Sequence, residues 1–280
     1  MAFSDNVNAS GEKNYFWDLQ CLDIVASTND IVRDAARKGA PEGMCVAALQ
    51  QTGGYGRQSR VWSSPKGGLY VSFLVRPQLP LAQRSSLSLV ASLTVRNTLN
   101  RVFRIEDMRI KWPNDVMCNG TKVAGINLEL VGNDALVIGI GINVFHPCNA
   151  PVSSEKYKFG FVSELDQTGR FAGVDTKVAP DGLTEEQRLC IVDVLIALLK
   201  EFEADYLCWS MRGFEVFRDD YVKQMTSVGR DLVMEGVDGT LMAAGQGVGV
   251  DSEGRLLLRD MEGVVRPIVA GEIHIVNRAY

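Results

Sequence analysis

The segment QQTGGYGRQSRVWSSPKGGLYVSF (residues 50–73) combines glycines, basic side chains and a tryptophan between two hydrophobic runs. The runs, 44–51 and 69–75, have the composition of strands, so the segment should be a loop between two strands. It matches neither a Walker loop, GxxxxGK[ST], nor a dinucleotide-binding GxGxxG, both of which open a helix. Its glycines and arginines can still bind a phosphate, although a basic surface hairpin fits this segment equally well.

A tight turn at Asn119-Gly120 decides how the middle of the chain is connected. Asn-Gly between apolar runs is the strongest short-range sign of a β-hairpin. Strand-like runs surround this turn at 109–112, 115–118, 122–131 and 135–145. They predict an antiparallel meander rather than a repeated βαβ unit.

Helices are predicted on both sides of these strands. The first should begin at Ser27 or Thr28, either of which can act as the N-cap. Apolar residues at helical spacing indicate a second helix over 85–103. Thr184 opens a long helix with a capping box, and another helix should follow to about residue 224.

The character of the sequence changes after Gly229. Short strands are separated by Asp-Gly or Glu-Gly pairs that end at Gly239, Gly254 and Gly263, which is the spacing of a small five-stranded β barrel. The 280 residues therefore divide into three predicted parts. These are a loose N-terminal tail (1–16), a main domain (17–226) and a C-terminal barrel (227–280).

Composition disfavours several classes of protein. Lys and Arg number 29 against 34 Asp and Glu, and the basic residues are spread out, so no nucleic-acid-binding surface is expected. The 6 cysteines form no CxxC pair and there are 2 histidines, which disfavours a disulfide framework, a metal centre or a histidine-based triad. No signal-peptide pattern and no apolar run long enough for a membrane span are visible, so a cytoplasmic location is expected.

Three further motifs carry signs of ligand binding. KWPND (111–115) places a lysine, an amide and a carboxylate around a bend fixed by proline. KVAGINLE (122–129) has a lysine at the start of a strand and a glycine that allows a ligand to approach the backbone. VIGIGINV (137–144) is an apolar strand interrupted by two glycines, which often marks a place where a large group packs against backbone. Together they favour the phosphate-binding interpretation of the loop.

These motifs occur in a fixed order with STN at 27–29 and GEI at 271–273, and in that combination the chain resembles the biotin protein ligases. Those enzymes attach biotin to a lysine of biotin-dependent carboxylases. The resemblance runs from residue 17 to the C-terminus and implies an α+β fold. A central mixed or antiparallel sheet flanked by helices, of the class II aminoacyl-tRNA synthetase and biotin ligase type, would be followed by an SH3-like β barrel.

The resemblance also implies a reaction. Biotin and ATP would be the substrates, with Mg²⁺ as the metal ion, and they would form biotinyl-5'-AMP and pyrophosphate before an acceptor lysine displaces AMP. The acceptor would be the biotin carboxyl carrier domain of acetyl-CoA carboxylase. No nucleic acid or membrane partner is implied, and the oligomeric state, monomer or homodimer, stays open.

Carried over to this sequence, the resemblance assigns catalytic roles to Lys122, Arg57 and Asp115. Lys122 would clamp the phosphate and the biotin carboxylate, and Arg57 would close over the phosphate. Asp115 would bind Mg²⁺, pair with Lys122 or receive the incoming lysine, and the sequence does not choose between these roles. The implied biotin-binding residues are Ser27, Thr28, Asn29, Gln51, Gly54, Tyr55, Gly56, Arg57, Lys122, Gly125, Gly139 and Ile140. The implied ATP- and adenylate-binding residues are Arg57, Arg60, Trp62, Lys111, Asn114, Lys122 and Asn143.

Two features depart from the family pattern. Tyr55 stands where the family motif GRGRxxRxW has an arginine, so the loop has one cation fewer with which to retain the adenylate. Residues 1–16 are too few for the winged helix of the family's bifunctional members, so the ligase-only type is expected.

Other interpretations remain open at this point. Lipoate ligases and octanoyltransferases belong to the same fold superfamily, and Cys118 next to KWPND is a candidate nucleophile for an octanoyltransferase. A regulatory protein that binds biotin without catalysis would fit the missing cation at Tyr55. Structural roles also compete with ligand binding, as helix caps for Ser27 and Thr28 and as a core residue for Trp62.

Overall fold

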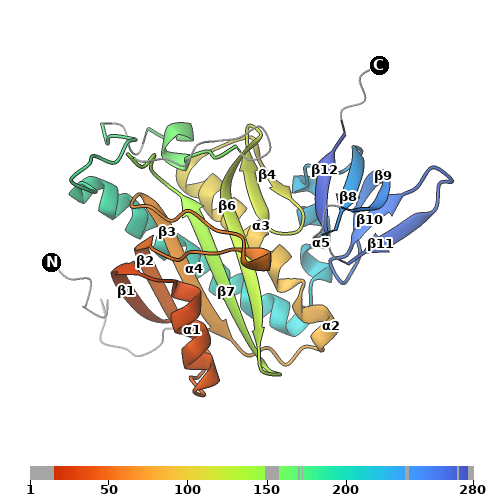
Figure 1. Ribbon diagram of the computed structural model, residues 1–280, viewed down its shortest axis with the longest axis horizontal. Helices are drawn as coiled ribbons and strands as arrows, with labels where there is room; N and C mark the ends of the chain where they lie inside the picture. The colour runs from red at the N-terminus through yellow and green to blue at the C-terminus, as the bar shows by residue number, and fades with distance from the viewer. Residues whose placement is uncertain are drawn as a thin grey trace.

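The computed structural model describes residues 16–148, 158–169, 171, 173–236, 240–269 and 271–276, and these residues form two sheets (Figure 1). The first sheet has seven strands in the order β1-β2-β3-β7-β6-β5-β4. They are β1 (Asp18–Val25), β2 (Met44–Gln51), β3 (Gly68–Val75), β4 (Met108–Lys111), β5 (Asp115–Cys118), β6 (Thr121–Val131) and β7 (Ala135–Asn143). The helices are α1 (Thr28–Arg37), α2 (Leu81–Arg84), α3 (Leu87–Phe103), α4 (Glu185–Arg212) and α5 (Glu215–Gln224).

The first sheet is mixed, as predicted. β4, β5, β6 and β7 form the predicted antiparallel meander, and Asn119 and Gly120 both have positive φ (49° and 75°) in the turn between β5 and β6. A two-residue hairpin of this kind requires positive φ at both positions, which Asn and Gly tolerate. β1 was not predicted; it pairs with β2 in parallel and α1 connects the two.

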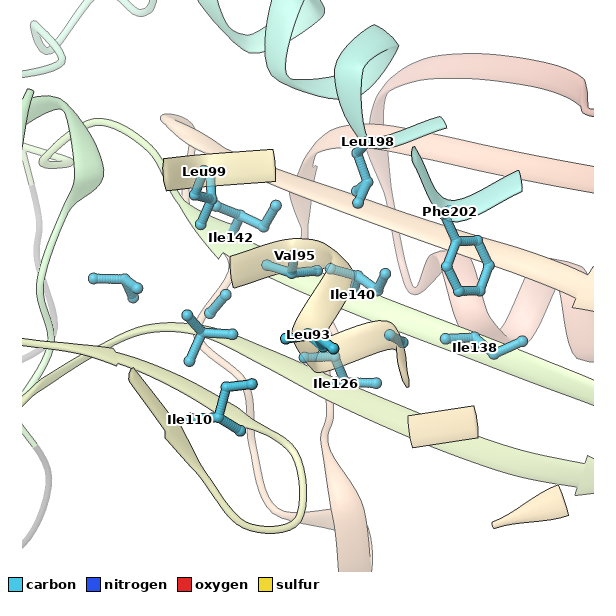
Figure 2. Close-up of a cluster of buried hydrophobic side chains, with 14 of the residues drawn as sticks. Leu93, Val95, Leu99, Ile110, Ile126, Ile138, Ile140, Ile142, Leu198 and Phe202 are labelled. Carbon is cyan, nitrogen blue, oxygen red and sulfur yellow. The ribbon is translucent and has the colours of Figure 1, made fainter. Parts of the chain in front are cut away.

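The core lies on one face of this sheet, beneath α3 and α4. Figure 2 shows the side chains of Val95 and Leu99 from α3 and of Leu198 and Phe202 from α4 next to Ile138, Ile140 and Ile142 of β7. Because side chains alternate along a strand, the residues between these isoleucines, Gly139 and Gly141, face the opposite side of the sheet. α1 covers only part of that opposite side, through Val32 and Ala36. The remainder is left for the candidate site.

The C-terminal segment forms a separate antiparallel sheet, which agrees with the predicted SH3-like barrel. Its strands, in the order β11-β10-β9-β8-β12, are β8 (Asp231–Glu235), β9 (Leu241–Val250), β10 (Leu256–Arg259), β11 (Val265–Ile268) and β12 (Glu272–Ile275). Gly254 and Gly263 adopt positive φ in two of the predicted turns, while the turn predicted at Gly239 lies outside the described residues. The predicted tail also falls outside them up to residue 15. The turn between β9 and β10 contacts the chain just after β4, where Trp112 Nε1 donates to the Gly254 carbonyl (3.0 Å).

No helix among the described residues is both long and apolar enough to cross a membrane.

Asp205 of α4 provides a test of the packing between α3 and α4. Its carboxylate accepts a hydrogen bond from Thr94 Oγ1 (2.7 Å), and burial raises the pKa of Asp205. Burial of the charged Asp205 carboxylate costs free energy of folding. This cost is absent below the pKa of Asp205 in the unfolded chain and complete above its raised pKa in the folded protein, so the stability of the protein falls as the pH rises between these two values. Asp205→Asn keeps an acceptor for Thr94 and removes the charge. We expect its Tm to exceed that of the wild type by about 2 °C near neutral pH, and the difference to disappear at about pH 4.

An exposed carboxylate serves as the control for this measurement. Asp34 pairs with Arg37 (3.4 Å) on the surface of α1, so Asp34→Asn should shift the Tm by less than about 1 °C at either pH. A Tm for Asp205→Asn at or below that of the wild type at neutral pH would contradict the expected penalty.

Candidate active site

A cavity of about 1150 Å³ lies on the face of the first sheet that the glycines leave open. The N-terminus of α1, the glycine-rich loop (residues 52–67), the strands β6 and β7, and β12 of the second sheet all border it. In Figure 1 this loop (orange) crosses in front of β6 and β7. Every residue that the sequence analysis assigned to the site borders the cavity except Gly54, which lies behind it against Gln51 and Ser64.

One side of the cavity is built by neutral polar groups at the start of α1. Ser27 is the N-cap, and its hydroxyl accepts from the Asp30 backbone N–H (3.4 Å). Thr28 donates both its backbone N–H and its hydroxyl to Gln51 Oε1 (2.8 and 3.1 Å). Gln51 Nε2 in turn donates to Ser64 Oγ in the glycine-rich loop (2.9 Å). Ser27 therefore caps the helix and also borders the cavity, while Thr28 contacts Gln51.

A second chain of contacts fixes Asn29. Ser72 Oγ lies 2.5 Å from Asn29 Oδ1 and 2.7 Å from Thr28 Oγ1, and Asn29 Nδ2 donates to Glu129 Oε1 (3.0 Å). Asn127 Nδ2 donates to the same oxygen of Glu129 (2.9 Å). Ser72 and Ser64 were missed by the sequence analysis. The available signals were a serine in an otherwise apolar strand and a serine directly before a proline in the quoted loop.

The glycines of β6 and β7 make room for these side chains. A methyl group at Gly139 would overlap the carboxamide of Asn29, and a methyl group at Gly141 would overlap the indole of Trp62. Gly125 also lies beneath the Trp62 ring. Trp62 thus packs directly on the sheet backbone, and its Nε1 is buried without a hydrogen-bond partner among the described residues.

Lys122 and Arg57 are two of the cations that border the same cavity. Lys122 Nζ is 2.5 Å from Asp115 Oδ1 and 4.9 Å from the centroid of the Trp62 ring. Arg57 Nη1 donates to Asn114 Oδ1 (3.2 Å), and Asn114 is itself held by donation to a backbone carbonyl of β6. Burial lowers the pKa of Arg57 and the nearby Asp115 opposes that shift, but an arginine stays charged at neutral pH. Of the three roles considered for Asp115, the structure contains the pairing with Lys122.

The remaining predicted residues occupy different positions around the cavity. Arg60 Nη2 contacts Glu272 Oε2 of β12 (2.7 Å), which connects the glycine-rich loop to the second sheet. Asn143 Nδ2 donates to the Lys122 carbonyl (3.2 Å), and Lys111 borders the cavity at the end of β4. Ile140 is 2% exposed with its side chain in the core, so its contribution to the cavity is limited to backbone.

Comparison with known proteins shows which family the chain belongs to. The model of the Biotin/lipoate A/B protein ligase family matches residues 22–143. The bifunctional ligase/repressor BirA of Bacillus subtilis is 31% identical over 260 residues, which is 90% of this chain and 72% of that protein. The chain belongs to the biotin protein ligase family.

Other members of this family agree along most of the chain. The biotin--[acetyl-CoA-carboxylase] ligase of Paracoccus denitrificans is 30% identical over 225 residues, covering 78% of this chain and 85% of that protein. A solved biotin protein ligase from Aquifex aeolicus in complex with biotin and ATP superimposes with a TM-score of 0.72 at 28% identity, over 92% of this chain and 98% of that one. The match therefore includes both sheets of the biotin protein ligase fold.

The residues around Asp115 suit a metal ion that arrives with a nucleotide. No group of three or more His, Cys, Asp or Glu side chains that could hold a metal occurs in the described part of the chain. Mg²⁺ commonly takes one or two protein carboxylates and completes its shell with substrate phosphates and water. Asp115, beside Lys122 in the cavity, fits that single-carboxylate pattern.

Proposed function

We propose that the chain is an ATP-dependent biotin protein ligase that works in two steps. In the first, a carboxylate oxygen of biotin attacks the α-phosphorus of ATP, and biotinyl-5'-AMP forms as pyrophosphate leaves. In the second, the amine of an acceptor lysine attacks the carbonyl of this mixed anhydride, loses a proton and forms an amide as AMP leaves. The acceptor is a biotin carboxyl carrier domain, in keeping with the acetyl-CoA carboxylase named for the Paracoccus relative.

One observation carries the proposal: two positioned cations and a cluster of neutral polar groups border the same cavity. Lys122 and Arg57 supply positive charge, and Asp115 and Asn114 hold them in place. Adenylation needs positive charge of this kind because negative charge develops on the α-phosphate and on the leaving pyrophosphate. The groups around Thr28 suit the ureido ring of biotin, which is uncharged and both donates and accepts hydrogen bonds.

The two substrates would therefore occupy different parts of the cavity. We assign the ring of biotin to the groups at the start of α1 and its carboxylate to the vicinity of Lys122. The nucleotide would lie toward Trp62 and Arg60, with Asn114 and Asn143 on its polar side. The Trp62 ring offers adenine a flat apolar surface.

Mg²⁺ would be held by Asp115 together with phosphate oxygens of ATP. When bound, it supplies additional positive charge to the phosphates. The residues of the chain have their own roles beside it: Lys122 neutralises the α-phosphate and the biotin carboxylate, and Arg57 closes the glycine-rich loop over them. Asp115 fixes the ammonium group of Lys122 before the substrates arrive.

The second sheet contributes to this site in the proposed arrangement. β12 borders the cavity and Glu272 holds Arg60, so the acceptor domain would approach next to the second sheet. We also propose that the chain divides into a main domain (17–226) and a barrel domain (227–280), because β8 to β12 form a sheet of their own. A monomer or homodimer in the cytoplasm remains the expected state.

Labelling of an acceptor tests the complete reaction. Purified protein incubated with biotin, ATP, Mg²⁺ and an apo carboxyl carrier domain should produce a streptavidin-reactive carrier. A carrier whose acceptor lysine is replaced by arginine is the control and should stay unlabelled. Absence of label on the intact carrier, while a known biotin ligase labels the same preparation, would contradict the proposed function.

An octanoyltransferase mechanism has less support. Its candidate nucleophile, Cys118, is 1% exposed and lies within the core, and burial raises the pKa of its thiol. A buried thiol with a raised pKa is a poor nucleophile because the thiolate is the reactive form. Cys118 also does not border the cavity.

A further inference from the structure

The side chain of Tyr55 contacts α1. Its hydroxyl accepts a hydrogen bond from Arg33 Nη1 (2.8 Å) and donates one to Asp30 Oδ1 (2.9 Å). Arg33 also pairs with Asp30 (2.6 Å) and lies 3.6 Å from Glu129. Tyr55 therefore joins the glycine-rich loop to a charged cluster on α1 and β6.

This cluster is continuous with the polar groups assigned to biotin. Glu129, which approaches Arg33 through one oxygen, accepts from Asn29 and Asn127 through the other. A displacement of Tyr55 would therefore disturb groups that orient Asn29. Burial and the hydrogen bond to Asp30 raise the pKa of Tyr55, so its hydroxyl stays protonated and remains able to donate.

The loop around Tyr55 is a compact turn that the Tyr55 hydroxyl connects to α1. Gly56 N–H donates to the Arg60 carbonyl (2.8 Å), and Tyr55 forms a β-bridge with Val61. Gln58 and Ser59, at the tip, have positive φ (57° and 56°), a conformation that costs energy in residues other than glycine. These contacts connect the two sides of the turn, so its attachment at Tyr55 positions the arginines on either side of the tip.

We propose that the Tyr55 hydroxyl is a positioning group that holds the glycine-rich loop against α1 before any ligand binds. A loop with one cation fewer loses part of its electrostatic attraction to the adenylate. Attachment to Asp30 and Arg33 offsets that loss, because a loop that is already closed does not have to be ordered when the adenylate forms. Slow release of biotinyl-5'-AMP follows from this arrangement, and that consequence rests on the ligase function proposed above.

Tyr55→Phe removes the hydroxyl and leaves the ring in place. Loss of its two hydrogen bonds to charged partners should raise the population of the open loop by about tenfold. In the ligand-free protein, limited trypsin digestion followed by mass spectrometry should show cleavage after Arg57 and Arg60 accelerated by about the same factor, since cleavage follows the open population. With biotin and ATP present, release of biotinyl-5'-AMP should rise about tenfold.

Tyr206→Phe is the matched control, because Tyr206 also hydrogen-bonds a carboxylate, that of Glu42, away from the cavity. It should change neither loop cleavage nor adenylate release, whatever its effect on Tm. Arg33→Met should accelerate loop cleavage as Tyr55→Phe does. The variant that carries both substitutions should show a smaller change in the free energy of loop opening than the sum of the two single changes.

Two results would overturn the proposal. One is a rate of loop cleavage in ligand-free Tyr55→Phe equal to that of the wild type. The other is an equal acceleration of loop cleavage in Tyr206→Phe, as expected from a general loss of stability. The cleavage measurement needs no activity, so a failure of the ligase function would leave its result interpretable.

Discussion

Lys122→Ala is expected to lower the kcat of biotin-dependent pyrophosphate exchange by about 10³-fold. The ammonium group of Lys122 lies in the cavity beside Asp115 and over the Trp62 ring, and the pairing with Asp115 holds it there. Removal of a preorganised charge deprives the transition state of stabilisation that water cannot replace in a closed site. Steady-state incorporation of labelled pyrophosphate into ATP measures the loss directly.

The folding of this variant needs a control of its own. Lys122 is partly exposed, so the unpaired Asp115 can be hydrated and the Tm should fall by no more than about 4 °C. Lys38→Ala changes an exposed lysine at the end of α1 and should leave exchange unaltered. A folded Lys122→Ala protein with exchange within tenfold of the wild type would contradict the role assigned to this lysine.

Two alanine substitutions in β7 are expected to raise the KM values of different substrates. The added methyl of Gly139→Ala overlaps Asn29, whereas that of Gly141→Ala overlaps Trp62. Displacement of a binding group by about 1 Å can cost on the order of 10²-fold. Gly139→Ala should therefore raise the KM for biotin by up to that factor, and Gly141→Ala should instead raise the KM for ATP. The two KM values in pyrophosphate exchange distinguish these outcomes.

Asn29→Ala separates the loss of the binding group from overpacking. It deletes the carboxamide that the Gly139 methyl would displace, and it introduces no overlap in the sheet. Its KM for biotin should rise as in Gly139→Ala, with a smaller loss of Tm, since overpacking costs about 1–3 kcal/mol. If each of the two variants, Gly139→Ala and Gly141→Ala, raised the KM for biotin and the KM for ATP by the same factor, the division of the cavity into a biotin part and a nucleotide part would be contradicted.

Much of the fold was predictable because local chemistry determines it. The Asn119-Gly120 turn requires positive φ at both residues, and the capping box that begins with Thr184 starts α4 as predicted. β1 was not predicted because it is an edge strand. Its side chains are largely half-buried or exposed, so apolar and polar residues do not alternate clearly along it. Its place in the sheet depends on pairing with β2, which is a tertiary property.

The candidate site was predictable where residues act through the backbone or through their own charge. Lys122, Arg57 and the β7 glycines fall into this group. The contacts of Tyr55 with α1 were not predictable, because Asp30 and Arg33 precede it by more than 20 residues and meet it only through the packing of α1 on the sheet. Ile140 is a different case: it borders the cavity between two site glycines, but strand alternation directs its side chain into the core.

Biotin-dependent ATP–pyrophosphate exchange by the purified protein is the most direct test of the central claim. The adenylation step alone produces this signal, so neither an acceptor nor a partner is needed. The proposed function predicts incorporation of labelled pyrophosphate into ATP when biotin is present, and none when lipoate replaces biotin or when both are omitted. Exchange with lipoate and not with biotin, or no exchange with either from a folded protein, would contradict it.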